Sequence, residues 1–144
     1  MAEQFDCEAA IARVREIYGP FEQHSETIQA GDSHYRASYT ADCVYRPIAG
    51  FTESSEVRGV EGFVAWLRQF LAAWEGYGTH VVGVDCVGRQ LIVEVRLQGR
   101  GRASGMELEG TVFQVLELRE GKIALTEDHL TREGAEHAAR EWAE

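Results

Sequence analysis

The feature that most constrains the fold is a change of pattern near Gly78, where helical spacing gives way to alternation. After this point, valine-rich segments are separated by short turns such as "GRASG" and "REGK". Such runs predict consecutive antiparallel strands joined by hairpins. The predicted strands span 79–87, 89–100, 105–118 and 123–130. We therefore expect the second half of the chain to form one sheet.

The first half has the three- and four-residue apolar spacing of amphipathic helices. We expect the first helix to kink or break at Gly19-Pro20, with a second segment continuing to about Ile28. Asp32 is a candidate N-cap for a short helix that ends near Tyr39. The other predicted elements are a strand at 43–50, a long helix at 60–75 and a closing helix at 131–144.

Helices followed by strands indicate the α+β class, in which helices pack against one sheet. With 144 residues, the chain is long enough for a sizeable core and is expected to be a single domain, 1–144. The predicted architecture is a curved antiparallel or mixed sheet, wrapped on one side by the N-terminal helices.

Composition excludes several classes of function. The formal net charge of −10 argues against a nucleic-acid partner, and no apolar stretch is long enough to span a membrane. The three cysteines are an odd number without C-x-x-C spacing, which favours free thiols in a reducing compartment. The chain also opens without a signal-peptide pattern, so we expect a cytoplasmic protein. No pattern of a nucleotide, zinc or other cofactor site occurs, and we expect neither cofactor nor metal.

Three ionisable residues in a row near the end of the last predicted strand raise the question of function. Side chains on a strand alternate between its faces, so Glu127 and His129 share one face while Asp128 lies on the other. Alternation on an earlier strand likewise predicts that Val93 and Val95 point inward. Alternation by itself does not tell which face of the last strand is the inner one.

Several strings, in order, resemble the SnoaL-like branch of the nuclear transport factor 2-like superfamily over roughly residues 10–137. They are "QAGD…YTADCVYRP", "VRGVEGFVAWLRQF", "GRGRASG" and "LREGKIALTEDHL". The resemblance implies a cone-shaped α+β scaffold with a deep pocket, which hosts polyketide cyclases, steroid isomerases, dehydratases, epoxide hydrolases and binding modules. It also implies inward positions at Gln114, Asp128 and Leu130, with Glu127 and His129 pointing outward.

The resemblance makes Asp128 the main catalytic candidate, because limonene-type epoxide hydrolases and SnoaL-like cyclases carry an aspartate in this part of the fold. Burial in an apolar pocket would raise its pKa and suit it to acid/base chemistry. A structural hydrogen-bond acceptor is the alternative role. Gln114 can donate to an oxyanion, and His24, on the helical face of Phe21 and Ile28, is either a proton-transfer partner or a core residue. The expected substrate-binding residues are Tyr45, Phe63, Trp66, Phe70, Val93, Val95, Val112, Leu116, Thr126 and Leu130.

Other features of the related enzymes are absent. The strand that carries an arginine and a second aspartate in the epoxide hydrolases reads Glu94-Val95-Arg96 here, with both charges predicted to face water. The steroid-isomerase base on the first strand is replaced by Arg46. These departures disfavour both mechanisms.

Three functions remain open. The first is a cofactor-free cyclase, isomerase or dehydratase for a small hydrophobic carbonyl compound, and the second is a binding module for an apolar metabolite. The third is a dimeric scaffold with a filled pocket. The face that carries Thr111, Phe113 and Val115 is also apolar, so we expect a homodimer through this outer sheet face.

Overall fold

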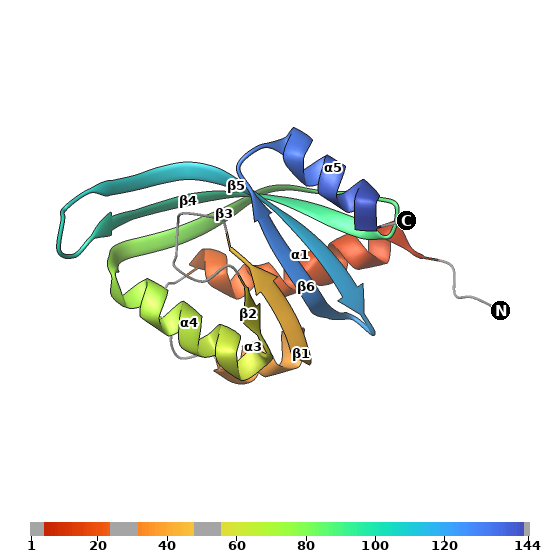
Figure 1. Ribbon diagram of the computed structural model, residues 1–144, viewed down its shortest axis with the longest axis horizontal. Coiled ribbons are helices and arrows are strands. Elements are labelled where there is room, and N and C mark those ends of the chain that lie inside the picture. The colour runs from red at the N-terminus through yellow and green to blue at the C-terminus, as the bar shows by residue number, and fades with distance from the viewer. Residues whose placement is uncertain (1–4, 24–31, 48–55, 143–144) are drawn as a thin grey trace.

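The protein is described by a computed structural model that covers residues 5–23, 32–47 and 56–142. Six strands form one sheet in the order β2-β1-β6-β5-β4-β3 (Figure 1). Their bounds are β1 Tyr39–Arg46, β2 Val57–Arg58, β3 Trp74–Val87, β4 Gln90–Gly101, β5 Glu107–Arg119 and β6 Lys122–His129. Strands β1 and β6 pair parallel, whereas all other neighbours pair antiparallel. The predicted α+β fold with a mixed sheet is confirmed.

The helices divide between the two faces of this sheet. They are α1 (Cys7–Gln23), α3 (Asp32–Ser38), α4 (Val60–Ala72) and α5 (Arg132–Trp142). The first three pack with the inner face, which carries Val93 and Val95, and α5 lies across the outer face, which carries Ile92 and Val115 (Figure 1). The strict alternation of β4 therefore sends successive side chains into two separate clusters.

The main cluster is held together by apolar stripes that the sequence spacing predicts. Helix α4 buries Val60, Phe63, Val64 and Leu71 against the sheet, as expected for residues three and four positions apart. Complete burial of a leucine or valine side chain contributes about 1.5–3 kcal/mol. This packing fixes α4 over the inner face, where its remaining aromatic residues border a cavity.

A tight turn joins the two central strands and begins their pairing. Glu120 and Gly121, between β5 and β6, both have positive φ values, 53° and 76°. A two-residue turn of this kind matches the twist of an antiparallel hairpin, and Arg119 pairs directly with Lys122 across it. Further along, the register shifts by one residue between Glu117 and Leu118, and beyond this irregularity Gln114 lies opposite Asp128.

Helix α5 covers part of the outer face with small side chains. Ala135 and Ala139 are fully buried and pack with Ile92 and Val115, since alanine permits a close approach of helix to sheet. The expectation that a second subunit is needed to cover this face is therefore wrong for the part beneath α5.

Two local predictions in the first half of the chain are also wrong. Helix α1 continues through Pro20 to Gln23, so no break occurs at Gly19-Pro20. Pro20 lacks only the hydrogen bond to the preceding turn, and the helix continues past it. Trp74 begins strand β3 instead of closing the long helix. The predicted segment through Ile28 lies outside the described residues.

A disulfide bond joins the start of α1 to the end of β3, between Cys7 and Cys86. Their Cα atoms are 6.2 Å apart, within the usual range for a disulfide. The expectation of free thiols is therefore wrong for this pair, because spacing along the chain does not reveal residues brought together by folding. Cys43 is buried and unpaired.

None of the described helices combines the length and apolar character needed to cross a membrane.

The disulfide predicts a measurable loss of stability on removal. It closes a segment with a sequence separation of 79 residues, and bonds of this kind contribute about 2–4 kcal/mol by restricting the unfolded chain. Urea unfolding of Cys7→Ser and Cys86→Ser should show equal losses, matched by the reduced wild type. In the unfolded, unreduced wild type only the thiol of Cys43 should titrate. A count of three thiols would contradict the bond.

Candidate functional site

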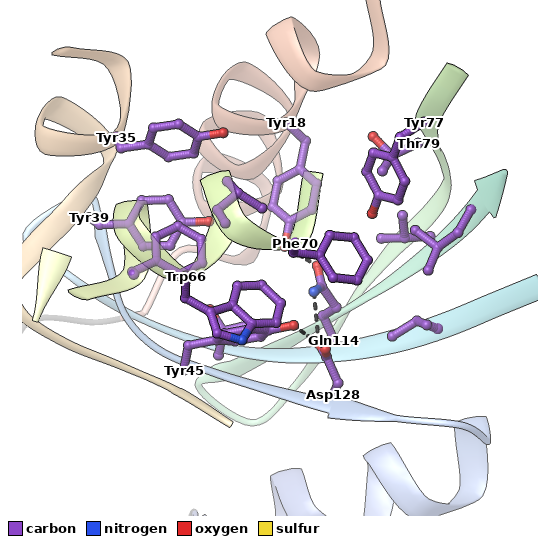
Figure 2. Close-up of a pocket in the computed structure, with 16 residues that line it drawn as sticks. Tyr18, Tyr35, Tyr39, Tyr45, Trp66, Phe70, Tyr77, Thr79, Gln114 and Asp128 are labelled. Carbon is purple, nitrogen blue, oxygen red and sulfur yellow. Dashed lines mark hydrogen bonds between the residues drawn. The ribbon is translucent and has the colours of Figure 1, made fainter. Parts of the chain in front are cut away.

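A cavity of about 120 Å³ lies between the inner face of the sheet and helices α1, α3 and α4 (Figure 2). All five tyrosines of the chain line it. The full lining is Tyr18, Tyr35, Tyr39, Tyr45, Phe63, Trp66, Leu67, Phe70, Tyr77, Thr79, Val95, Leu97, Val112, Gln114, Thr126 and Asp128. A concave, mostly aromatic site with a few polar groups is typical of small-molecule pockets.

Helix α4 builds one wall of the cavity from a stripe of aromatic rings. Trp66 stacks on Phe70 with ring centroids 5.3 Å apart, and Phe70 meets Tyr77 of β3 edge-on at 5.3 Å. Tyr45 of β1 contacts Trp66 edge-on at 4.9 Å. Trp66 and Phe70 are nearly parallel, at 16°, whereas Tyr45 and Tyr77 meet them at 68° and 84°.

Asp128 of β6 lies at the polar end of the cavity, held by two neighbouring strands (Figure 2). Gln114 Nε2 donates to Asp128 Oδ1 at 2.8 Å, and the Tyr45 hydroxyl donates to Asp128 Oδ2. Behind Gln114, the hydroxyl of Tyr18 donates to Gln114 Oε1 at 2.6 Å. A chain of hydrogen bonds thus runs from α1 to the carboxylate and fixes its orientation.

Burial raises the pKa of Asp128 from 3.8 to about 6. The hydrogen bonds from Tyr45 and Gln114 lower this pKa, as does the charge of His129, but they do not outweigh desolvation. The carboxyl therefore changes charge close to neutral pH, where a general acid or base works best.

The phenols around Asp128 keep their protons. Burial raises the pKa of Tyr18, Tyr39, Tyr45 and Tyr77, and the charge of Asp128 raises each of them further. The hydroxyl groups of Tyr39 and Tyr77 make no hydrogen bond within the described part of the chain. Both rings turn towards the cavity in Figure 2. They are free to donate to a ligand.

No arginine, lysine or histidine from the described residues lines the cavity. Among the described residues, Asp128 is the sole carboxylate that lines the cavity, and none of the described lining residues forms an ion pair with it. No three histidine, cysteine, aspartate or glutamate side chains in residues 5–23, 32–47 and 56–142 gather as a metal site requires.

The structure brings most of the sequence-derived candidates together. Those that line the cavity are Asp128, Gln114, Tyr45, Phe63, Trp66, Phe70, Val95, Val112 and Thr126. Val93 and Leu116 are fully buried in the main core but do not border the cavity. Leu130 is 67% exposed, so its predicted inward position is wrong. Strand β6 ends at His129, and alternation no longer applies beyond it. His24 lies outside the described residues.

Sequence reasoning missed several residues that line the cavity. They are Tyr18, Tyr35, Tyr39, Leu67, Tyr77, Thr79 and Leu97. Tyr18 lies four residues after Val14, Leu67 lies four after Phe63, and Leu97 lies two after Val95, so helical and strand spacing was a usable signal. Tyr77 and Thr79 lie two apart on β3, but the strand was predicted to start only after Tyr77.

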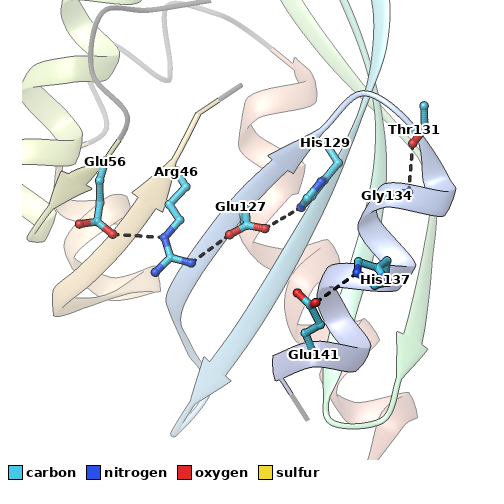
Figure 3. A network of polar contacts seen from close by, with 8 residues as sticks. All are labelled: Arg46, Glu56, Glu127, His129, Thr131, Gly134, His137 and Glu141. Carbon is cyan, nitrogen blue, oxygen red and sulfur yellow. Dashed lines mark hydrogen bonds and ion pairs between the residues drawn. The ribbon is translucent and has the colours of Figure 1, made fainter. Parts of the chain in front are cut away.

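The residues next to Asp128 lie on the other face of β6 (Figure 3). Glu127 accepts a hydrogen bond from Arg46 Nη1 at 2.9 Å and contacts His129 Nε2 at 2.7 Å. Arg46 also pairs with Glu56 at 3.2 Å. These side chains therefore pair with one another outside the cavity, in agreement with the predicted outward orientation of Glu127 and His129.

Residues 21–126 match the family model of the SnoaL-like domain. The chain belongs to the SnoaL-like domain family. The matched region of this SnoaL-like protein ends two residues before Asp128, so family membership alone does not define the role of that carboxylate.

Three solved structures share the fold of this SnoaL-like protein at low identity. A protein from Jannaschia sp. CCS1, described as a candidate SnoaL-like polyketide cyclase, is 16% identical, with a TM-score of 0.69 and 96% of each chain covered. A nuclear transport factor 2-like protein from Burkholderia thailandensis E264 is 21% identical, with a TM-score of 0.71, covering 91% of this chain and 96% of that chain.

An LEH-like epoxide hydrolase from M. tuberculosis is 19% identical, with a TM-score of 0.65, covering 90% of this chain and 83% of that chain. No curated protein matches this chain. At such identities these neighbours establish the fold of the SnoaL-like protein and leave its chemistry to the cavity residues.

The raised pKa of Asp128 predicts a distinctive pH dependence of stability. Between about pH 4 and pH 6 the unfolded chain has released this proton and the folded protein still holds it, so stability falls as pH rises through this window. This shift of the pKa corresponds to a loss of up to about 3 kcal/mol in the free energy of unfolding. The Asp128→Asn variant should not show this fall in stability between about pH 4 and pH 6.

Urea unfolding from pH 3.5 to pH 8 measures the difference in the free energy of unfolding between the wild type and Asp128→Asn. The other carboxyl groups are common to both proteins and cancel in the comparison. A difference that does not vary with pH would show that Asp128 titrates normally.

Proposed function

We propose that this protein is a cofactor-free acid/base enzyme for a small hydrophobic carbonyl compound, with Asp128 as the base. The observation that carries the proposal is a desolvated carboxyl, with a pKa of about 6, inside an open aromatic cavity. Membership of the SnoaL-like domain family supports a small-molecule pocket. Perturbed carboxyls in clefts are common at catalytic sites.

In the proposed step, ionised Asp128 takes a proton from the carbon next to the substrate carbonyl. The C–H bond breaks, its electron pair forms the carbon–carbon double bond of an enolate, and the carbonyl oxygen gains the negative charge. In a substrate whose enolate is conjugated with a second double bond, protonated Asp128 then returns the proton to the far carbon of that bond, which moves the double bond and isomerises the substrate. Alternatively, it gives the proton to a departing hydroxyl group, which dehydrates the substrate.

The surrounding residues have distinct roles in this proposal. Tyr45 and Gln114 hold the carboxylate in place, and Tyr18 orients the Gln114 amide. Because Gln114 already donates to Asp128, the free phenols of Tyr39 and Tyr77 are the better donors to the enolate oxygen. Neutral donors placed where charge develops stabilise a transition state most effectively in a site that excludes water.

A second candidate function is a non-catalytic module that binds an apolar metabolite. The observation in its favour is that both oxygens of Asp128 already accept a hydrogen bond, as in a purely structural carboxyl. The scaffold alternative is disfavoured by the unfilled cavity. The epoxide hydrolase alternative is disfavoured because Glu94 pairs with Arg132 on the outer face and Arg96 is exposed.

The homodimer and the cytoplasmic location stay predictions. The outer face beyond α5 still exposes Val82, which leaves room for a second subunit there. The Cys7–Cys86 bond, of a kind that is rare in reducing compartments, weighs against the cytoplasm.

Turnover is tested by hydrogen–deuterium exchange at the α-carbon of small cyclic ketones in D₂O, followed by NMR. The wild type should accelerate exchange, with a rate that rises through about pH 6 as Asp128 ionises. Asp128→Asn should lose the enzymatic rate by about 10²–10⁴-fold. Asp42→Asn removes the same charge from an exposed position on β1 and serves as the matched control.

Equal rates in the wild type and Asp128→Asn would overturn the proposed base. A screen in which ketones bind and no ketone exchanges would favour the binding module.

A further inference from the structure

The electrostatics of the cavity select the charge of its ligand. Its one charged side chain from the described residues is Asp128, which is surrounded by neutral phenols and the Gln114 amide. A carboxylate in an apolar site without a cation is poorly stabilised. An anionic ligand would add a second negative charge, whereas a cationic ligand would supply the missing partner.

The walls of the cavity favour the same charge. Eight aromatic side chains line it: Tyr18, Tyr35, Tyr39, Tyr45, Phe63, Trp66, Phe70 and Tyr77. The faces of such rings carry partial negative charge and attract cations, and tryptophan does so most strongly. The Tyr45 ring lies between these walls and the carboxylate, since it contacts Trp66 at 4.9 Å and its hydroxyl reaches Asp128.

Ring orientation strengthens this electrostatic selection. Tyr45 meets Phe63 at 77° and Trp66 at 68°, and Phe70 meets Tyr77 at 84°. The rings therefore border the cavity from several directions instead of forming one slot. A rounded group with charge spread over its surface suits such an enclosure better than an extended chain.

The cavity volume limits the size of the enclosed group. At about 120 Å³, it is slightly smaller than the apolar cavity of about 150 Å³ that holds benzene in a known engineered protein. A nitrogen that carries three or four small alkyl groups is of this size, and a polycyclic skeleton is far larger.

From charge, ring arrangement and volume together, we propose that the ligand of this cavity is a small organic cation, a quaternary or protonated tertiary amine. The inference deepens the proposed function, on which it rests for the identity of the site: the substrate is a carbonyl compound that also carries the charged nitrogen. During enolate formation this nitrogen stabilises the new negative charge, a task for which the described lining offers no basic side chain.

The test compares two probes of nearly equal shape, choline and 3,3-dimethylbutan-1-ol, in which a carbon replaces the charged nitrogen. Binding to the full chain is measured at pH 8 by NMR titration. The wild type should bind choline at least tenfold more tightly than the neutral alcohol. Asp128→Asn should lower this ratio, leaving only the preference that the aromatic rings provide, and Asp42→Asn should leave it unchanged.

Trp66→Leu gives a second readout that does not involve the carboxylate. It should weaken the binding of choline more than that of the alcohol, because leucine preserves apolar contact but lacks a π face. Tighter or equal binding of the alcohol by the wild type overturns the proposal, and so does a lack of binding by both probes.

The two proposals fail in different ways. A clear choline preference, without exchange of either the cyclic ketones or a ketone that carries a trimethylammonium group, would leave the cation site standing and remove the catalytic role. Ketone exchange that depends on Asp128, without a choline preference, would leave the enzyme standing and remove the cation.

Discussion

The carboxyl of Asp128 is largely withdrawn from water and has no positive partner in the described cavity lining, and the rest of the site is arranged around this constraint. Two neutral donors, Tyr45 and Gln114, stabilise its charged form only in part, so its pKa remains high at about 6. An ion pair in the same place would have held the group permanently charged. The structure instead keeps it able to exchange a proton or accept a charged partner near neutral pH.

The sheet order explains how the site is assembled from distant parts of the sequence. Strand β6 lies between β5 and β1, so Asp128 has Gln114 on one side and Tyr45 nearby on the other, where Tyr45 pairs with Thr126. The parallel pairing of β1 with β6 requires the long excursion of the chain through α4 and the hairpins. The tight turn at Gly121 and the one-residue register shift between Glu117 and Leu118 together place Gln114 opposite the carboxyl.

Much of the architecture could be predicted from local patterns. The period-two alternation of the strands separates Asp128 from its charged neighbours, and the spacing of Phe63, Trp66 and Phe70 predicts one aromatic face of α4. These inferences need only local geometry. The resemblance of the sequence to the SnoaL-like family supplied the orientation of β6, which alternation alone cannot provide.

The failed predictions depend on information that local patterns lack. Leu130 follows the last residue of β6, and the sequence does not state where alternation stops. Tyr77 was missed because β3 begins earlier than its valine-rich segment suggests. The Cys7–Cys86 bond and the cover provided by α5 depend on tertiary contacts between residues far apart in sequence.

The most direct test of this account is the titration of the Asp128 carboxyl carbon by ¹³C NMR, assigned with Asp128→Asn. The account predicts a midpoint near pH 6, together with a further upward shift in Tyr45→Phe, because the lost hydrogen bond favours the charged form. A midpoint near the ordinary value of 3.8 would show that the carboxyl is solvated, and it would contradict the account.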